Sequence, residues 1–367
     1  MRIGIDASRI ARDEKSGTEN YTLNLIRALA AIDRKNYYQL YFNQPPKFFE
    51  LPGGNFASKV IASKRFWTQL RLAAELAINP VDLLFVPAHT LPVLRRPALK
   101  TVVTVHDLGA QFLKEYHEFP SRYYLNWSTA FVANYASHLI AVSGATKKDL
   151  TRRFKVPASR ITVVHEGVDQ SFFKRASEAE IELCRKKYGL ASKYFLFVGT
   201  IQPRKNLTRL IEAFARSRLN LDLAIAGQPG WLYKEIYEAP ERFGVENKVK
   251  FLGFVPNEDI VKLYSGSTAF VFPSLYEGFG LPVLEAMACG CPVITSSVSS
   301  LPEVAGEAAV LVDPDDTKAI EKALKDVATD PTLRERLTAA GYRRVKDFTW
   351  ERSAKETLAV LAKVGQK

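Results

Sequence analysis

The sequence has 367 residues, of which 47% are hydrophobic, and a formal net charge of +12 at pH 7. This composition excludes a disordered chain, and the length favours two domains over one core. Three cysteines are too few for a disulfide scaffold and suit a reducing compartment. We find no signal-peptide pattern and no apolar run long enough to cross a membrane, so we expect a cytoplasmic protein.

The positive charge lies almost wholly in the first half of the chain. Residues 1–175 hold 25 Lys and Arg against 14 Asp and Glu (+11), whereas residues 176–367 hold 26 against 25 (+1). A basic half indicates an anionic partner, which could be nucleic acid, a phosphate-bearing substrate or an acidic membrane leaflet, or it is simply a solvated surface. The basic residues are scattered and form no recognised binding module, so we expect no nucleic-acid partner.

Short apolar runs typical of strands alternate with amphipathic helical patterns along the whole chain. We expect strands at residues 2–8, 38–43, 81–88, 100–107, 137–143, 160–167, 193–200, 221–227, 248–255, 268–275, 292–297 and 308–314, a first helix at 19–32 and a final helix after 350. Continuous apolar strands separated by helices predict parallel sheets covered on both faces. The sequence therefore predicts an α/β protein with two doubly wound Rossmann-like domains, residues 1–175 and 176–349, whose strand ends face a central cleft.

The segment "SLYEGFGLPVLEAMACG" (274–290) predicts a strand end, a turn and a helix. The glycines at 278 and 280 let the backbone approach a ligand, and free N–H groups at the helix start attract phosphate. A third glycine is missing, so this is not the dinucleotide fingerprint. Glu285 stands in an apolar helix and needs a partner there, either a vicinal diol such as ribose or a nearby Lys or Arg.

Three weaker candidates lie at other strand ends and helix starts. Arg204 and Lys205 follow the strand in "FLFVGTIQPRKN" and could neutralise a diphosphate, although paired cations are more often surface residues. His106 ends the strand in "VTVHDLG" and is either a general acid or base or a structural histidine. Gly17 in "SGTENYTLNL" precedes a helix and is a further candidate phosphate contact.

The acidic pattern Asp313-Pro314-Asp315 could in principle hold a divalent metal. It follows a strand and precedes the helix "TKAIEKALKDV", so we expect Asp313 and Asp315 to cap that helix. The five histidines show no ligand spacing, and we expect no metal and no cofactor.

In this order, these segments resemble the retaining GT-B glycosyltransferases of glycosyltransferase family 4. The resemblance covers almost the whole chain and includes "SGTENYTLNLIRAL", "TVHD", "FLFVGTIQPRKNL" and "EGFGLPVLE". The residues of the segment "VGTIQPRKNLTRLIEAF" look most like those of family members that use GDP-mannose. The resemblance implies transfer of a hexose, most directly mannose from GDP-mannose, to a hydroxyl of a glycan or lipid-linked acceptor in cell-envelope synthesis, with the final helix crossing back to the N-terminal domain. A UDP-sugar donor and a sugar-nucleotide epimerase are the alternatives.

The resemblance also implies roles for the candidate residues. Glu285 would bind the donor ribose and Glu277 the sugar hydroxyls, Arg204 and Lys205 would stabilise the departing diphosphate, and His106 would contact the sugar. Gly17 and the segment Gly278, Phe279, Gly280 and Leu281 would line the sugar and phosphates, without a metal. Many relatives carry Asn where "HEGVD" has Glu166, and we assign no donor contact to Glu166.

A basic and aromatic helical pattern, "SKRFWTQLRLAAEL", suggests contact with the membrane. It holds Lys64, Arg65 and Arg71 together with Phe66 and Trp67. Such a helix suits the surface of an anionic membrane, whereas the alternative is an amphipathic helix that packs Trp67 inward. We expect peripheral association with the inner face of the membrane.

Overall fold

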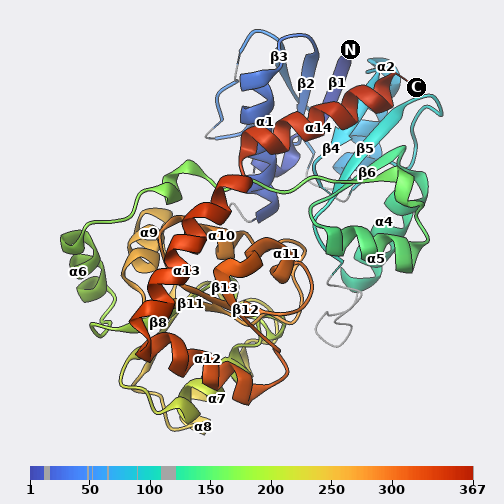
Figure 1. The fold of residues 1–367 in the computed structure, drawn as a ribbon. Helices are drawn as coiled ribbons and strands as arrows, with labels where there is room; N and C mark the ends of the chain where they lie inside the picture. Colours follow the sequence, from blue (N-terminus) through green and yellow to red (C-terminus); the bar gives the residue numbers. More distant parts are fainter. Residues whose placement is uncertain are drawn as a thin grey trace. The chain divides into compact units, whose positions relative to one another are not determined.

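The computed structural model describes residues 1–11, 17–47, 49–51, 53–63, 66–88, 90–108 and 121–366, with the backbone alone for 121–126. These residues form two compact units (Figure 1). The N-terminal unit comprises residues 1–108, 121–167 and 349–366, and the C-terminal unit comprises residues 168–348. The chain therefore leaves the first unit after Gly167 and returns to it at Thr349, so the C-terminal helix belongs to the N-terminal unit, as the resemblance implied.

The N-terminal unit contains a seven-stranded parallel sheet in the order β3-β2-β1-β4-β5-β6-β7. Its strands are β1 (Arg2–Asp6), β2 (Tyr37–Phe42), β3 (Phe56–Val60), β4 (Leu83–Val86), β5 (Lys100–Val105), β6 (His138–Ala141) and β7 (Ile161–Val163). Its helices include α1 (Gly17–Ile32), α2 (Ala73–Ile78), α4 (Ser121–Tyr135), α5 (Gly144–Phe154) and α14 (Trp350–Gly365). Figure 1 shows α14, in red, lying beside the blue α1.

The core of this unit explains why the last helix returns. Ala354 and Leu361 of α14 are fully buried in the same apolar cluster as Ile26 and Leu29 of α1. The helix buries one apolar stripe and exposes its charged face, which is the pattern of a helix packed on a sheet. Tyr21 of α1 also contacts the Trp350 ring at the start of α14, with 5.7 Å between centroids.

Strand β3 was missed in the sequence. Phe56 is its one buried residue, and the three residues from Ser58 to Val60 are exposed. An edge strand that packs through a single side chain carries neither an apolar run nor an alternating pattern, so periodicity could not reveal it.

The C-terminal unit contains a six-stranded parallel sheet in the order β10-β9-β8-β11-β12-β13. Its strands are β8 (Tyr194–Val198), β9 (Asp222–Ala226), β10 (Val249–Gly253), β11 (Ala269–Phe272), β12 (Val293–Ser296) and β13 (Ala309–Val312). Its helices include α6 (Glu178–Lys187), α7 (Leu207–Ser217), α8 (Lys234–Arg242), α9 (Asn257–Gly266), α10 (Leu281–Ala288), α11 (Leu301–Ala305), α12 (Thr317–Thr329) and α13 (Pro331–Arg344). Strands β9, β11 and β12 are buried along their whole length, as expected for a sheet covered on both faces.

An ionic cluster on Asp259 joins α9 to α6 and its C-terminal end. The Asp259 carboxylate accepts hydrogen bonds from Lys187 Nζ at 2.6 Å, Lys262 Nζ at 2.8 Å and Tyr188 Oη at 2.9 Å. The hydrogen bonds from Lys187 and Lys262 lower the pKa of Asp259 to about 2. Because this pKa lies below that of the unfolded carboxyl, the cluster stabilises the fold above about pH 4 and loses that contribution as the pH falls towards 2.

We therefore expect Asp259→Asn to lower the free energy of unfolding by about 2 kcal/mol at pH 7. The difference between variant and wild type should shrink below pH 4, where the wild-type carboxyl also becomes protonated. Urea titrations from pH 3 to pH 7 measure both quantities. A difference that stays constant with pH would show that the charge of Asp259 is not the stabilising element.

Candidate functional site

Three loops meet at the carboxyl ends of the adjacent strands β8, β11 and β12. They are residues 199–206 after β8, 273–280 after β11 and 297–300 after β12. The first two loops are tied by the backbone, since Leu275 N donates to Arg204 O at 2.9 Å. Asn206 strengthens this link, because its side-chain amide donates to Pro273 O at 3.1 Å. Strand order thus brings together segments that lie some seventy residues apart in the sequence.

The two predicted cations flank one predicted carboxylate. Arg204 Nη1 lies 2.9 Å from Glu277 Oε2, and Lys205 Nζ lies 2.6 Å from Glu277 Oε1. Lys205 also stands over the Phe272 ring, 4.6 Å from its centroid. The side chains of Arg204, Lys205 and Glu277 are 14%, 9% and 10% exposed. The structure therefore assembles Arg204, Lys205 and Glu277 into one nearly buried cluster, which we call the cation–carboxylate cluster.

The charge state of Glu277 follows from these neighbours. Burial by itself raises the pKa of Glu277, but the charges of Arg204 and Lys205 outweigh it and place the pKa below its ordinary value. Glu277 is thus an anion at neutral pH, and the cluster carries a net charge of +1. A net positive, water-poor site of this kind favours an anionic group such as a diphosphate.

Two serines fix the backbone that carries Glu277. Glu277 N donates to Ser299 Oγ at 3.1 Å, and Ser300 Oγ lies 2.9 Å from Glu277 O and 2.6 Å from Phe279 O. Ser300 is fully buried in the loop after β12. Sequence reasoning missed Ser299 and Ser300, because a serine after a strand gives no signal of which carbonyl group it will reach.

The predicted glycine turn ends at Gly280, directly before helix α10. Gly280 has φ +119° and ψ 43°, and a Cβ atom there would lie 2.8 Å from Leu301 Cδ2. Leu281 is the first residue of α10 and Pro282 lies in its first turn, where a missing N–H does no harm. Gly278, Phe279, Gly280 and Leu281 therefore follow Glu277 directly and lead into the N-terminus of α10.

We expect Gly280→Ala to lower the stability by about 1–3 kcal/mol, because alanine is strained at this φ and meets Leu301. Displacement of the loop should also weaken nucleotide binding. Thermal melting with and without nucleoside diphosphate measures both effects. A variant with unchanged melting temperature and unchanged nucleotide binding would contradict this view of the turn.

Glu285 lies on α10, one helical turn after Leu281, and is partly exposed. It lies near Tyr264 of α9, where burial first and the charge of Glu285 second raise the pKa of the phenol well above its ordinary value. A described neighbour of the Glu285 carboxylate is thus the buried Tyr264. Neither a ribose diol nor a basic side chain is tested as the partner of Glu285 by this placement, so both stay predictions.

The N-terminal unit holds the remaining two predicted residues. His106 directly follows β5, with Nδ1 3.1 Å from Glu166 Oε1 and Nε2 2.7 Å from Pro87 O. Gly17 is the first residue of α1, and a Cβ atom there would meet nothing within 4 Å. Tyr21, one turn further along α1, packs edge-on against the His106 ring with 4.6 Å between centroids. Glu166 is a residue to which the sequence assigned no role, and the structure makes it the ionic partner of His106.

The prediction that Asp313 and Asp315 cap helix α12 is wrong in detail. The N-cap is Asp316, whose carboxylate accepts hydrogen bonds from Lys318 N and Ala319 N. Asp313 accepts from Asp315 N, and Asp315 pairs with Arg209 at 3.2 Å. Three closely spaced acidic residues could each cap the helix, and the exact helix start decides which one does. Within the described part of the chain, no cluster of three or more His, Cys, Asp and Glu is placed to hold a metal ion.

The segment with the basic and aromatic pattern forms a π-helix over Trp67–Leu72 and continues as α2. Trp67 packs inward, and its Nε1 donates to Ile61 O at 2.7 Å. Phe66 and Leu70 are 71% and 61% exposed. Lys64 and Arg65 lie outside the described residues. No described helix combines the length and apolar character needed to span a bilayer.

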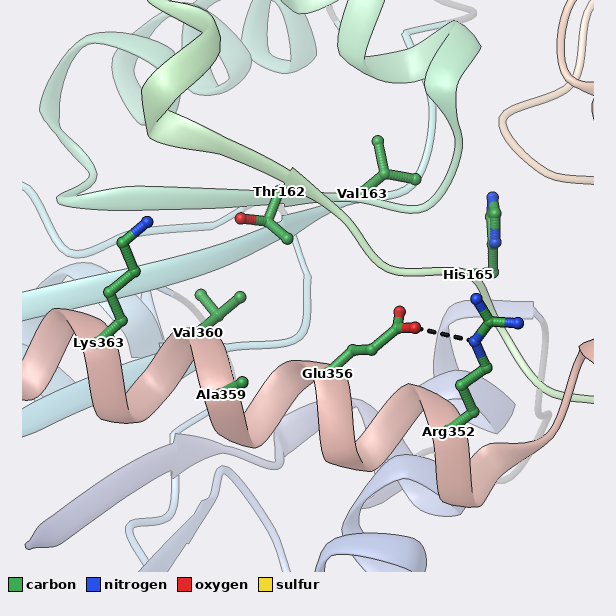
Figure 2. Close-up of a pocket in the computed structure, with 8 residues that line it drawn as sticks. All are labelled: Thr162, Val163, His165, Arg352, Glu356, Ala359, Val360 and Lys363. Atoms are coloured by element: carbon green, nitrogen blue, oxygen red, sulfur yellow. Dashed lines mark hydrogen bonds and ion pairs between the residues drawn. The ribbon is translucent and has the colours of Figure 1, made fainter.

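A groove of about 420 Å³ lies between β7 and α14 (Figure 2). Its lining includes Val163, His165 and Lys363, together with Arg352 and Glu356, whose Nε and Oε1 atoms are bonded at 2.9 Å. None of these residues was a predicted site residue. The predicted residues of this unit, His106 and Gly17, do not line the groove.

Comparison with known proteins identifies the family. The family profile described as "Glycosyl transferases group 1" matches residues 181–344, and "Glycosyltransferase Family 4" matches residues 15–172. The O-antigen chain mannosyltransferase B of Escherichia coli is 36% identical over 264 residues, which are 71% of this chain and 69% of that protein. The chain belongs to glycosyltransferase family 4. The resemblance noted in the sequence is thereby confirmed.

A further relative and two solved structures are similar to this glycosyltransferase. The serotype-specific mannosyltransferase WbdA of Escherichia coli is 31% identical over 280 residues, or 73% of this chain and 33% of WbdA. Among solved structures, sucrose-phosphate synthase from Thermosynechococcus elongatus has a TM-score of 0.79 at 22% identity. The match covers 99% of this chain and 98% of the synthase chain. Anabaena HepE in complex with UDP and glucose has a TM-score of 0.76 at 20% identity. This match covers 98% of this chain and 99% of the HepE chain. These likenesses confirm the GT-B fold class.

Proposed function

We propose that this glycosyltransferase transfers mannose from GDP-mannose, with retention of configuration, to a hydroxyl of a glycan or lipid-linked acceptor. The observation that carries the proposal is the cation–carboxylate cluster, in which two cations and one anion lie beside the N-terminus of α10 at the carboxyl ends of β8 and β11. The choice of mannose is supported by relatives that are themselves named mannosyltransferases. Synthesis of a cell-envelope glycan is the setting that the O-antigen relatives suggest.

Each charged group in the cluster has a proposed task. Arg204 and Lys205 stabilise the negative charge that develops on the departing diphosphate, and Glu277 accepts hydrogen bonds from hydroxyls of the sugar. The amides of residues 278–281 bind the phosphates, since the N-terminus of a helix favours anions. Glu285 accepts from the ribose hydroxyls. His106 and Gly17 act on the sugar and the diphosphate, as the family resemblance implies.

The reaction breaks the bond between the anomeric carbon and the diphosphate and forms a bond from that carbon to the acceptor oxygen. Retention requires the acceptor to enter on the face from which GDP leaves. We propose a front-face substitution, in which the acceptor proton passes to an oxygen of the departing diphosphate. Catalysis then rests on positioning and on charge stabilisation at the leaving group. Arg204 and Lys205 supply that stabilisation, so we propose that transfer is independent of added metal.

A thermal-shift series with GDP, UDP, GDP-mannose and UDP-glucose tests the choice of donor. A ligand that binds only the folded protein raises the melting temperature by mass action, so GDP and GDP-mannose should raise it most. Stabilisation by uridine nucleotides alone would overturn GDP-mannose in favour of a UDP-sugar. Conversion of a sugar nucleotide in the absence of any acceptor would favour an epimerase instead.

We also propose that the protein associates peripherally with anionic membranes to reach a lipid-linked acceptor. Phe66 and Leu70 are large, exposed apolar side chains separated by four positions, and Arg71 follows them. Apolar side chains next to basic ones favour the interface of an anionic bilayer. Flotation with anionic vesicles at low salt should recover the wild type and much less of a Phe66→Ser, Leu70→Ser variant. Equal recovery of the two proteins, or none of either, would contradict this role.

A further inference from the structure

His106 has an oxygen acceptor at each ring nitrogen. Nδ1 lies 3.1 Å from Glu166 Oε1, and Nε2 lies 2.7 Å from the carbonyl oxygen of Pro87. A carbonyl oxygen and an ionised carboxylate can only accept hydrogen bonds, so each nitrogen must carry a proton to donate one. A neutral imidazole carries one such proton. The doubly protonated, positively charged ring is therefore the form that satisfies both contacts.

The surroundings of the ring favour this charged form. The side chains of His106 and Glu166 are 12% and 6% exposed, so solvent screens their interaction weakly. Burial by itself lowers the pKa of His106, but the hydrogen bond and the charge of Glu166 outweigh it, and the pKa of His106 is raised. Pro87 O and the charge of Asp107 add to the increase.

Among the described contacts of the ring, the further titratable group is Tyr21, which carries no charge at neutral pH. Tyr21 meets the imidazole edge-on, at 86° between the ring planes, and its hydroxyl lies 3.3 Å from Thr104 Oγ1. Burial raises the pKa of the Tyr21 phenol far above neutral pH. The described charges that act on the ring are thus the carboxylates of Glu166, at 3.1 Å, and Asp107.

We propose that Glu166 is a positioning residue that holds His106 as a fixed cation, so that His106 acts on the substrate through its positive charge and not as a base, while its two N–H groups stay bonded to Glu166 and Pro87 O. This inference rests on the proposed function, in which His106 contacts the transferred sugar. A fixed cation beside a sugar that is losing diphosphate stabilises negative charge on the leaving group and needs no proton transfer. Glu166 precedes Gly167, the last residue of the N-terminal unit before the chain enters the C-terminal unit.

The charge of the ring can be measured directly on the full-length protein. Histidine labelled with ¹⁵N gives ring-nitrogen chemical shifts that separate the cation from the neutral tautomers, and His106→Gln assigns the signals among five histidines. We expect both nitrogens of His106 to be protonated at pH 7 in the wild type. A neutral His106 ring at pH 7 in the wild type would overturn the proposal.

Glu166→Gln removes the charge while keeping the shape. The glutamine amide can donate to Nδ1, so a neutral ring whose Nε2–H bonds Pro87 becomes well satisfied. The titration midpoint of His106 should therefore move to lower pH. Glu356→Gln is the matched control, because it makes the same charge change on α14 of the same unit, where Glu356 pairs with Arg352. An unchanged midpoint in Glu166→Gln, or an equal change in both variants, would contradict the assignment of Glu166.

The direction of the pH profile separates a fixed cation from a base. If His106 acts as a cation, kcat of Glu166→Gln should fall about tenfold as the pH rises from 6 to 8, while kcat of the wild type changes little. If His106 acts as a base, the variant should instead be more active at the acidic end than the wild type, and the proposal is lost. The NMR titration does not require turnover, so a failure of the proposed function and a failure of this inference are told apart.

Discussion

Replacement of Lys205 by alanine is expected to lower kcat by at least about 100-fold, since a preorganised donor to a developing anion contributes roughly 3–4 kcal/mol. Lys205 is nearly buried and bonds Glu277 at 2.6 Å, so its ammonium group is held in place beside Arg204. The effect should appear in kcat and in kcat/KM together, as for an interaction that strengthens in the transition state. Steady-state kinetics at saturating donor measures it.

Arg216→Ala is the matched control for this prediction. Arg216 is a cation on α7, the helix that follows the Lys205 turn, and it is 49% exposed and paired with Glu212. An ion pair with such an exposed partner contributes about 0–1 kcal/mol to the free energy of unfolding, and Arg216 is not part of the cation–carboxylate cluster. The control should keep wild-type kinetics. Near-wild-type turnover of Lys205→Ala at saturating donor would remove Lys205 from the catalytic machinery.

Replacement of Glu277 by alanine should damage both stability and activity. It leaves Arg204 and Lys205 side by side without their anion, and the loss of one partner of a buried ion pair costs about 3–5 kcal/mol. Transfer should fall at least about 100-fold, because the sugar loses the carboxylate that orients it. Nucleotide binding should survive, since the two cations that meet the diphosphate are retained.

Three measurements separate these effects. Urea unfolding gives the stability, thermal shift with GDP gives nucleotide binding, and product formation gives transfer. The variant should be stabilised by GDP at least as much as the wild type, because an added anion relieves the unpaired cations. Glu212→Ala, which removes a partly exposed carboxylate from α7, should change the free energy of unfolding by less than about 1 kcal/mol. A Glu277→Ala protein that no longer binds GDP would show that the carboxylate, and not the cations, holds the nucleotide.

Most of the fold could be predicted from the sequence because its strands are buried on both faces. Strands such as β9 and β11 are continuous apolar runs, and such runs between helices have few structural alternatives. Strand β3 could not be predicted, since it buries only Phe56. The cap of α12 was placed on the wrong acidic residues for a related reason: pattern reasoning locates a helix start only to within a few residues.

The candidate site could be predicted as a set of residues but not as a geometry. Arg204, Lys205 and Glu277 were each recognisable from strand ends and family motifs, yet their contact depends on β8 and β11 being neighbours in the sheet. The sequence does not show that order. The same holds for His106 and Glu166, which lie sixty positions apart and meet because β5, β6 and β7 are consecutive in the sheet. The roles of Ser299 and Ser300 could not be predicted, because a hydrogen bond between a side chain and the backbone has no sequence pattern.

The most direct test of the account is the structure of the product. GDP-α-mannose labelled with ¹³C at the anomeric carbon is incubated with the protein and a lipid-linked glycan acceptor, and the product is analysed by NMR. The account predicts release of GDP and appearance of the label in the glycan as an α-linked mannose, at least about 100-fold faster in the wild type than in Lys205→Ala. A β-linked product would contradict retention, and an unlabelled glycan with wild-type protein would contradict mannosyl transfer.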